Sequence, residues 1–181
     1  MTDAQKQTLL RLAREAILSR FDPSQPELPA EPEFQAKRGL FVTLRLDGDL
    51  RGCIGLIQPR RSIAEEVVEM AREAAFGDPR FPPLRREELP RIEIEVSLLS
   101  EMIPVKDISE IVIGRDGLLL RQGFRSGVFL PQVPVEWNWD LQTYLSQLCR
   151  KAGLPDRAWK RDDAELFRFE AEVFGETHIL P

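Results

Sequence analysis

The chain has 181 residues, of which 43% are hydrophobic and 30% charged, and its formal net charge is −5 at pH 7. These proportions exclude a disordered protein, and the acidic balance argues against a nucleic-acid partner, which would need clustered positive charge. A polar start, two distant cysteines and no apolar run of about 18 residues predict a cytoplasmic protein without signal peptide, membrane span or disulfide framework.

The chain begins with a predicted helix and a proline-rich segment. Thr2 and Asp3 can cap a helix that runs to about Arg20. Its apolar stripe consists of Leu9, Leu12, Ala13, Ala16 and Ile17. Four prolines follow between positions 23 and 32, so we expect an extended wrap over the surface, neither helix nor central strand.

Two runs of alternating residues, 40–46 and 50–57, then predict a β-hairpin around the turn signal Asp47-Gly48-Asp49. A three-residue loop is favoured because it places both apolar rows on one face. The predicted opposing pairs are Leu46 with Leu50, Leu44 with Gly52, Val42 with Ile54, Arg45 with Arg51 and Thr43 with Cys53.

This register leaves two interpretations of the hairpin open. Two arginines directly across a strand pair repel unless water or an anion separates them, and Gly52 would leave room for a ligand at the backbone. The face carrying Arg45, Arg51 and Cys53 is then a binding site for a small anionic ligand. Alternatively it is a solvated surface, with Cys53 as a small apolar filler.

A second helix is predicted from a capping box at Ser62 and Glu65 to Gly77. The stiff loop 78–84 follows, and it also has two interpretations. Asp78 and Arg80 either pair locally in a rigid crossover or line the pocket that the hairpin faces. The next strand, 92–98, carries Glu93 and Glu95 on its polar side, and these could neutralise the arginines if the strand lies beside the hairpin.

The remaining chain predicts more strands and a third helix. A helical turn is expected at 107–110, a second hairpin from 111–113 and 118–121, and a short strand at 128–130. Asp140 can cap a helix that ends at Gly153, and Cys149 lies on its apolar face. Trp137, Trp139 and Trp159 bracket this helix and are expected to anchor its ends. A last strand is predicted over 166–174.

Helices and hairpins mix without a strand-helix-strand repeat, which predicts an α+β fold with mainly antiparallel sheet. The first two helices and first hairpin would form one half, and the second hairpin and third helix the other. Phosphate-binding glycine loops and paired cysteines are absent, and there is only one histidine, so no cofactor and no metal site are expected.

Cys53 remains as the candidate catalytic nucleophile, because neighbouring arginines lower the pKa of a thiol. The sequence supplies no obvious general base for it. Asp78 or Glu93 could serve only if the fold brings them close, and His178 lies in what reads as a loose tail.

These stretches resemble the AMMECR domain family, the protein A component of the AmmeMemoRadiSam system. The resemblance rests first on Leu50-Arg51-Gly52-Cys53-Ile54-Gly55, which matches the family's signature hexapeptide, and on Asp78-Pro79-Arg80-Phe81-Pro82-Pro83-Leu84. Further matches follow in order at 88–90, 96–99, 114–118, 129–133, 139–140 and 151–154, so that roughly residues 9–174 are covered. The chain departs from the family at Asp116, where many members carry a histidine.

The resemblance implies one AMMECR-type domain over residues 1–181, built from two interleaved α+β subdomains with a cleft near the Arg51-Gly52-Cys53-Ile54-Gly55 strand. The expected ligand contacts there are Arg45, Arg51, Gly52, Gly55, Asp78 and Arg80. It also implies a Memo-like protein and a radical S-adenosylmethionine enzyme as partners. The family suggests no reaction, so an enzyme component and a non-catalytic scaffold both stay open.

Overall fold

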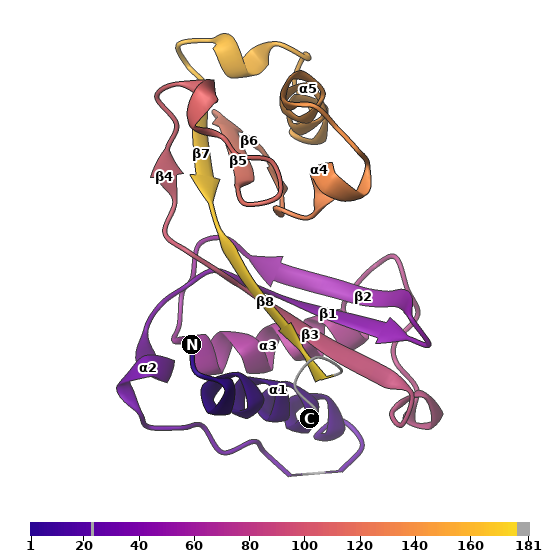
Figure 1. The fold of residues 1–181 in the computed structure, drawn as a ribbon. Coiled ribbons are helices and arrows are strands. Elements are labelled where there is room, and N and C mark those ends of the chain that lie inside the picture. The colour runs from indigo at the N-terminus through magenta and orange to yellow at the C-terminus, as the bar shows by residue number, and fades with distance from the viewer. Residues whose placement is uncertain (23, 177–181) are drawn as a thin grey trace. The chain divides into compact units, whose positions relative to one another are not determined.

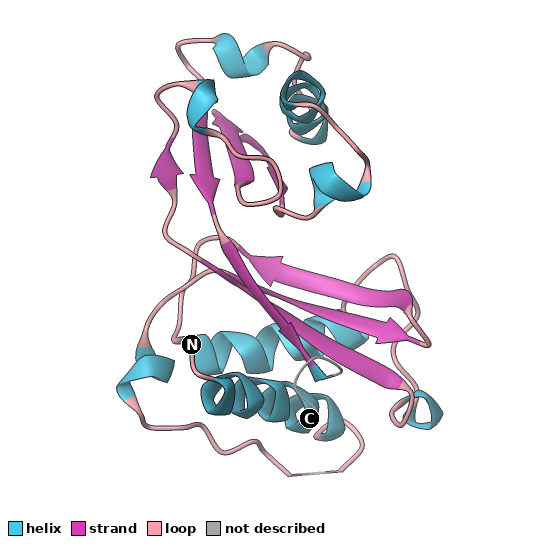
Figure 2. Ribbon diagram, viewed as in Figure 1, coloured by secondary structure: helices cyan, strands magenta, loops and turns pink. Residues whose placement is uncertain are grey.

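The computed structural model describes residues 1–22 and 24–176, drawn as ribbons in Figures 1 and 2. It contains two compact units. Of the described residues, the first unit comprises 1–99 together with 172–176, and the second unit comprises 100–171. Both contain helices and a four-stranded sheet, which confirms the α+β prediction. The units are interleaved in sequence, because the first is made from two separated segments. His178 lies outside the described residues.

The first unit consists of two long helices against one sheet. The strand order is β2-β1-β3-β8, so β2 lies at an edge, and α1 and α3 contact one face of the sheet (Figure 1). Its helices are α1 (Asp3–Leu18), α2 (Pro32–Gln35) and α3 (Ile63–Phe76), and its strands are β1 (Leu40–Leu46), β2 (Asp49–Leu56), β3 (Ile92–Leu99) and β8 (Ala171–Gly175).

Capping boxes begin both long helices of the first unit, where the sequence predicted a box at Ser62 and a cap at Thr2. Thr2 accepts a hydrogen bond from the Gln5 backbone N–H at the start of α1, and Ser62 does the same for Glu65 at the start of α3. The predicted stripe of α1 is fully buried in the core. Tertiary burial of these apolar faces, more than helix propensity, therefore holds the two helices in place.

The proline-rich segment contains one short helix, which corrects the expectation that it has none. Pro32 occupies the first turn of α2, where a missing backbone N–H costs nothing because that N–H has no intrahelical partner. Phe34 is buried in the core of the first unit and fixes this turn to it.

The second unit has its own sheet and core. Its strands follow the order β4-β7-β5-β6, and α5 packs against β5 and β6 (Figure 2). The strands are β4 (Ile103–Pro104), β5 (Gly117–Gln122), β6 (Arg125–Phe129) and β7 (Glu165–Phe169), and the helices are α4 (Val133–Glu136) and α5 (Leu141–Lys151). Single turns of 3-10 helix occur at η1 (Arg86–Glu88) in the first unit and at η2 (Ile108–Glu110) and η3 (Ala158–Lys160) in the second.

The predicted start of α5 is confirmed, whereas the predicted second hairpin has the wrong partner. The Asp140 carboxylate accepts the Thr143 backbone N–H at 2.7 Å and caps α5. Residues 111–113 form no strand, because the Asp116 carboxylate accepts the Val112 N–H at 2.8 Å and closes a tight loop. The strand β5 pairs instead with β6, across a turn at Gly123.

The predicted last strand is in fact two strands that belong to different sheets. It breaks at Glu170, whose backbone O accepts the Ser100 N–H at 2.8 Å and whose N–H donates to Ser100 Oγ at 2.9 Å. The alternation of apolar residues continues through this break, so the pattern of the sequence alone does not reveal it.

The three tryptophans do not share one role. Trp139 and Trp159 pack against the core of the second unit, as expected for residues that anchor the ends of a helix. Trp137 is 68% exposed, so the expectation that it anchors α5 is wrong.

Candidate functional site

The β1–β2 hairpin follows the predicted register only in part. Thr43 opposes Cys53 and Leu44 opposes Gly52 as predicted, but a bulge then shifts the pairing so that Arg45 opposes Leu50. The turn contains two residues, Asp47 and Gly48, both with positive φ, which matches the twist of a tight hairpin. The predicted juxtaposition of Arg45 and Arg51 is therefore wrong. The bulge inserts Arg51 as the unpaired extra residue of β2.

Arg51 forms a buried ion pair. Its Nε donates to Glu88 Oε1 at 2.9 Å and its Nη2 to Glu88 Oε2 at 3.1 Å, in a two-point arrangement. Arg51 is 8% exposed and Glu88 6%. These hydrogen bonds lower the pKa of Glu88 to about 2, which keeps its carboxylate charged. The ion pair thus connects the bulge of β2 to η1.

Asp78 and Arg80 close the outer edge of β2 at Cys53. The Asp78 carboxylate accepts the Cys53 N–H at 2.9 Å, and Arg80 Nη2 donates to the Cys53 carbonyl at 3.1 Å. Arg80 also binds Asp78 through Nε at 3.0 Å and Nη2 at 2.7 Å. The two side chains supply the acceptor and donor that a neighbouring strand would offer, and so they protect an exposed sheet edge.

The Asp78 carboxylate is nearly inaccessible, at 4% exposure. The Arg80 hydrogen bonds, joined by the backbone N–H groups of Cys53 and Arg80, hold the pKa of Asp78 well below its usual range. A carboxylate with such a depressed pKa is a poor general base, because it releases a bound proton too readily. The structure brings Asp78 close to Cys53, but the hydrogen bonds of Asp78 indicate that it positions β2 and does not act as a base.

We expect Asp78→Asn to lower the free energy of unfolding by about 1–3 kcal/mol, because a buried acceptor becomes an amide facing N–H donors. Urea denaturation followed by circular dichroism measures this loss. Asp49→Asn is the matched control, since Asp49 lies exposed on the same strand and should change stability little. Equal losses in both variants would contradict a specific role of Asp78 at the strand edge.

The glycines of β2 lie against other parts of the first unit. A Cβ on Gly52 would lie 2.1 Å from the backbone O of Ala74 in α3. A Cβ on Gly55 would lie 2.3 Å from the Phe41 ring. Both glycines therefore permit close packing, and the space beside each is filled by the protein itself.

The Cys53 side chain lies on the sheet face opposite α3, beside Thr43. The Thr43 hydroxyl donates a hydrogen bond to the Cys53 sulfur at 3.3 Å, and Cys53 is partly exposed. Thr43 opposes Glu95 on its other side, so the three side chains form a row across β2, β1 and β3.

Arg45 lies one row away from Cys53 and opposes Glu93. An opposite charge directly across a strand pair is stabilising, so the crowding of arginines expected from the sequence does not arise. The strand β3 does lie beside the hairpin, and of the two glutamates considered from the sequence it is Glu93 that opposes Arg45. Glu93 opposes Arg45 and not the Thr43–Cys53 row, so it is not adjacent to the thiol.

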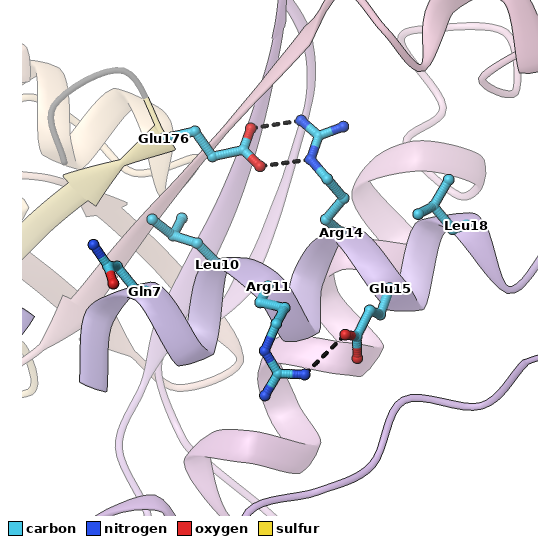
Figure 3. Close-up of a pocket in the computed structure, with 7 residues that line it drawn as sticks. All are labelled: Gln7, Leu10, Arg11, Arg14, Glu15, Leu18 and Glu176. Carbon is cyan, nitrogen blue, oxygen red and sulfur yellow. Dashed lines mark hydrogen bonds and ion pairs between the residues drawn. The ribbon is translucent and has the colours of Figure 1, made fainter. Parts of the chain in front are cut away.

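A groove of 560 Å³ follows α1 on the first unit (Figure 3). In its walls Arg14 binds Glu176 through two hydrogen bonds, at 2.6 and 2.5 Å, and Arg11 binds Glu15 at 2.8 Å. The groove is lined by Gln7, Leu10, Arg11, Arg14, Glu15, Leu18 and Glu176, none of which the sequence singled out as a site residue.

Three further properties concern possible metal ligands, membrane-spanning helices and the second thiol. Across residues 1–22 and 24–176, no group of three or more histidine, cysteine, aspartate or glutamate side chains is arranged to hold a metal ion. No helix in the same ranges is long and apolar enough to cross a membrane. Cys149, the other thiol, is fully buried in the second unit, where burial raises its pKa.

Comparison with known proteins identifies the family. The AMMECR1 family model matches residues 10–174. A Methanopyrus kandleri protein is 46% identical over 93% of this chain and 86% of its own, and one from Methanocaldococcus jannaschii is 44% identical over 93% and 88%. The crystal structure of the uncharacterised protein PH0010 from Pyrococcus horikoshii superimposes with a TM-score of 0.85, at 38% identity, over 94% of this chain and 90% of that one. The chain therefore belongs to the AMMECR1 family.

Proposed function

We propose that this protein binds a small anionic ligand on the sheet face that carries Cys53 and acts as an enzyme component. The observation that carries the proposal is the pairing of a half-open guanidinium with a partly exposed thiol. Arg80 is held by Asp78 and by the Cys53 carbonyl, yet 54% of its side chain is open to solvent. An oriented guanidinium of this kind suits recognition of a carboxylate or phosphate.

In this proposal the ligand is held by directional donors more than by net charge. The carboxylates of Asp78 and Glu93 already balance the nearby guanidinium groups. Arg80 and Arg45 would contact the ligand directly. Cys53 would be the nucleophile or covalent anchor, with its sulfur positioned by the hydrogen bond from the Thr43 hydroxyl. The remaining predicted residues, Arg51, Gly52, Gly55 and Asp78, would set the shape of β2 beneath the ligand.

Thiol labelling of the native protein tests the nucleophile. With a disulfide reagent we expect one equivalent to react quickly before unfolding and two afterwards, because Cys53 is partly exposed and Cys149 is buried. The Cys53→Ser variant should lose the fast phase and keep its melting temperature. An inert Cys53 in the native protein would remove the nucleophile from the proposal.

Protection from labelling tests the ligand. Inorganic phosphate or acetate should slow alkylation of Cys53 in the wild type. Arg80→Lys keeps the charge but loses the two-point contact with Asp78 that orients the guanidinium, so protection should weaken in that variant. If neither anion protects the thiol, or if both proteins are protected equally, an anion site at Arg80 is excluded.

A non-catalytic scaffold is the second candidate, and one observation favours it. Three buried charged residues make their hydrogen bonds within the protein, as residues of a structural network would. Arg51 binds Glu88, and Asp78 accepts the Cys53 N–H. The partners proposed on either view are a Memo-like protein and a radical S-adenosylmethionine enzyme. Co-purification with them that survives Cys53→Ser and Arg80→Lys would favour the scaffold.

A further inference from the structure

An exposed apolar surface lies on the second unit and shares no residue with the Cys53 face. We call it the Trp137 surface, and it comprises Val112, Ile113, Val135 and Trp137, exposed by 45%, 36%, 57% and 68%. A Cβ on Gly114 would lie 3.2 Å from Val135 Cγ2, so the loop that carries Val112 and Ile113 contacts α4. Apolar residues gathered in this way commonly mark a binding surface, whereas single exposed ones do not.

The Trp137 ring is held in place although it is exposed. It stacks on Trp139, with ring centroids 6.3 Å apart and planes inclined by 22°. Trp139 in turn meets Phe129 edge-on at 5.4 Å and packs against the core of the second unit. A side chain already ordered before binding loses little conformational entropy when a partner arrives. Trp137 thus has the properties of a binding anchor.

The loop on the other side of this surface is also fixed. Asp116 is fully buried, and its carboxylate accepts the Val112 N–H at 2.8 Å. Arg115 binds the same carboxylate through Nε at 2.9 Å and Nη2 at 2.7 Å, so its positive charge is balanced. The loop therefore presents Val112 and Ile113 from a rigid base and adds no unbalanced positive charge.

Two exposed acidic residues flank Trp137 in the sequence. Glu136 precedes Trp137 in α4 and is exposed, and Asp140 is exposed at the start of α5. Hydrogen bonds from Thr143 lower the pKa of Asp140, which keeps it a carboxylate. The face of a tryptophan ring also attracts cations, and arginine most often. Apolar and negative features together are complementary to an aliphatic side chain next to an arginine.

We propose that the Trp137 surface is a docking site for a partner protein segment that carries an arginine beside an aliphatic residue. The guanidinium stacks on Trp137 and bonds to Glu136, while the aliphatic side chain packs on Val135 and Ile113. The proposal uses no residue of the Cys53 face, so it stands whether or not a ligand binds there.

The test uses the full chain and a defined probe, the peptide acetyl-Leu-Arg-Leu-amide, titrated in two-dimensional NMR of the labelled protein. We expect saturable shifts at Val112, Ile113, Val135 and Trp137 with millimolar affinity. Trp137→Ala should abolish them without lowering the melting temperature, since the ring is mostly exposed. Glu136→Gln should weaken binding by about two- to fivefold, the effect expected of one exposed charge contact.

Two controls make the outcome decisive. The peptide acetyl-Leu-Glu-Leu-amide should not bind, and Cys53→Ser should bind the arginine peptide like the wild type. Absence of saturable shifts, shifts centred on other residues, equal binding of the glutamate peptide, or unchanged binding by Trp137→Ala would each overturn the proposal. A failure of the anion site at Arg80 would leave all of these measurements unaffected.

Discussion

Replacing Glu88 by glutamine should lower the free energy of unfolding by about 3–5 kcal/mol, because Arg51 would keep its charge in a buried place without a counter-charge. Chemical denaturation of the purified protein measures this loss. The side chain of glutamine is nearly the same size as that of glutamate, so the substitution creates no cavity. The loss of stability would therefore come from loss of the ion pair with Arg51.

Glu87→Gln is the matched control for this variant. Glu87 is the preceding residue of η1 and 67% of its side chain is exposed, so its replacement should change stability by less than about 0.5 kcal/mol. If Glu88→Gln proves as mild as Glu87→Gln, Arg51 has other partners and the ion pair does not hold β2.

The same pair predicts the direction of acid sensitivity. The pKa of Glu88 is about 2 in the folded protein, below its value of about 4.3 in an unfolded chain. Its contribution is therefore complete above about pH 4.3 and is lost as the pH falls towards 2. In the Glu88→Gln variant this part of the acid dependence should disappear, so that the stability curves of variant and wild type converge at low pH.

The second large effect is expected at Gly52. A Cβ there would meet the backbone O of Ala74 at 2.1 Å, so Gly52→Ala must push α3 away from β2. Backbone atoms cannot rotate aside as a side chain does, and we expect a loss of about 3 kcal/mol or more. Thermal and urea unfolding measure it, and a reduced yield of folded protein would be a further sign.

Gly175→Ala provides the comparison, because its Cβ would lie 3.3 Å from the nearest atom, the backbone O of Ile94. A small shift accommodates that contact, so the loss should be clearly smaller than at Gly52. A harmless Gly52→Ala would instead mean that the space beside Gly52 is open, as a ligand-binding interpretation of this glycine requires.

Local signals in the sequence were sufficient for the three long helices α1, α3 and α5. The capping boxes at Thr2 and Ser62 and the cap at Asp140 begin helices where predicted, because the residues that satisfy the first N–H groups are neighbours in the chain. The antiparallel β1–β2 hairpin was also predictable, but the burial along β2 was not, because Leu50 of the expected apolar row is 41% exposed and Arg51 of the expected polar row is buried. Alternation of apolar residues and a turn signal are local properties as well.

The geometry of the candidate site could not be predicted, because it depends on contacts between residues that are far apart in the sequence. The family match at 88–90 includes Glu88, but no local pattern indicates that Glu88, and not exposed Glu87, binds Arg51. The bulge at Arg51 was missed because a two-residue and a three-residue turn both fit Asp47-Gly48-Asp49, and only the bulge reconciles the shorter turn with the buried apolar row. The family resemblance singled out Asp78 and Arg80 but said nothing about the backbone of Cys53.

The first unit is discontinuous in the chain, and this has a consequence for its biosynthesis. The strand β8 and Glu176, whose carboxylate accepts the Ile94 N–H at 2.9 Å and binds Arg14, leave the ribosome after all of the second unit. During translation the edge of β3 stays unpaired while residues 100–171, which are contiguous, already have every strand they need. The sheet of the first unit is therefore completed only after residues 100–171 have been synthesised, and until then the nascent chain exposes an unpaired strand edge, a feature that favours aggregation.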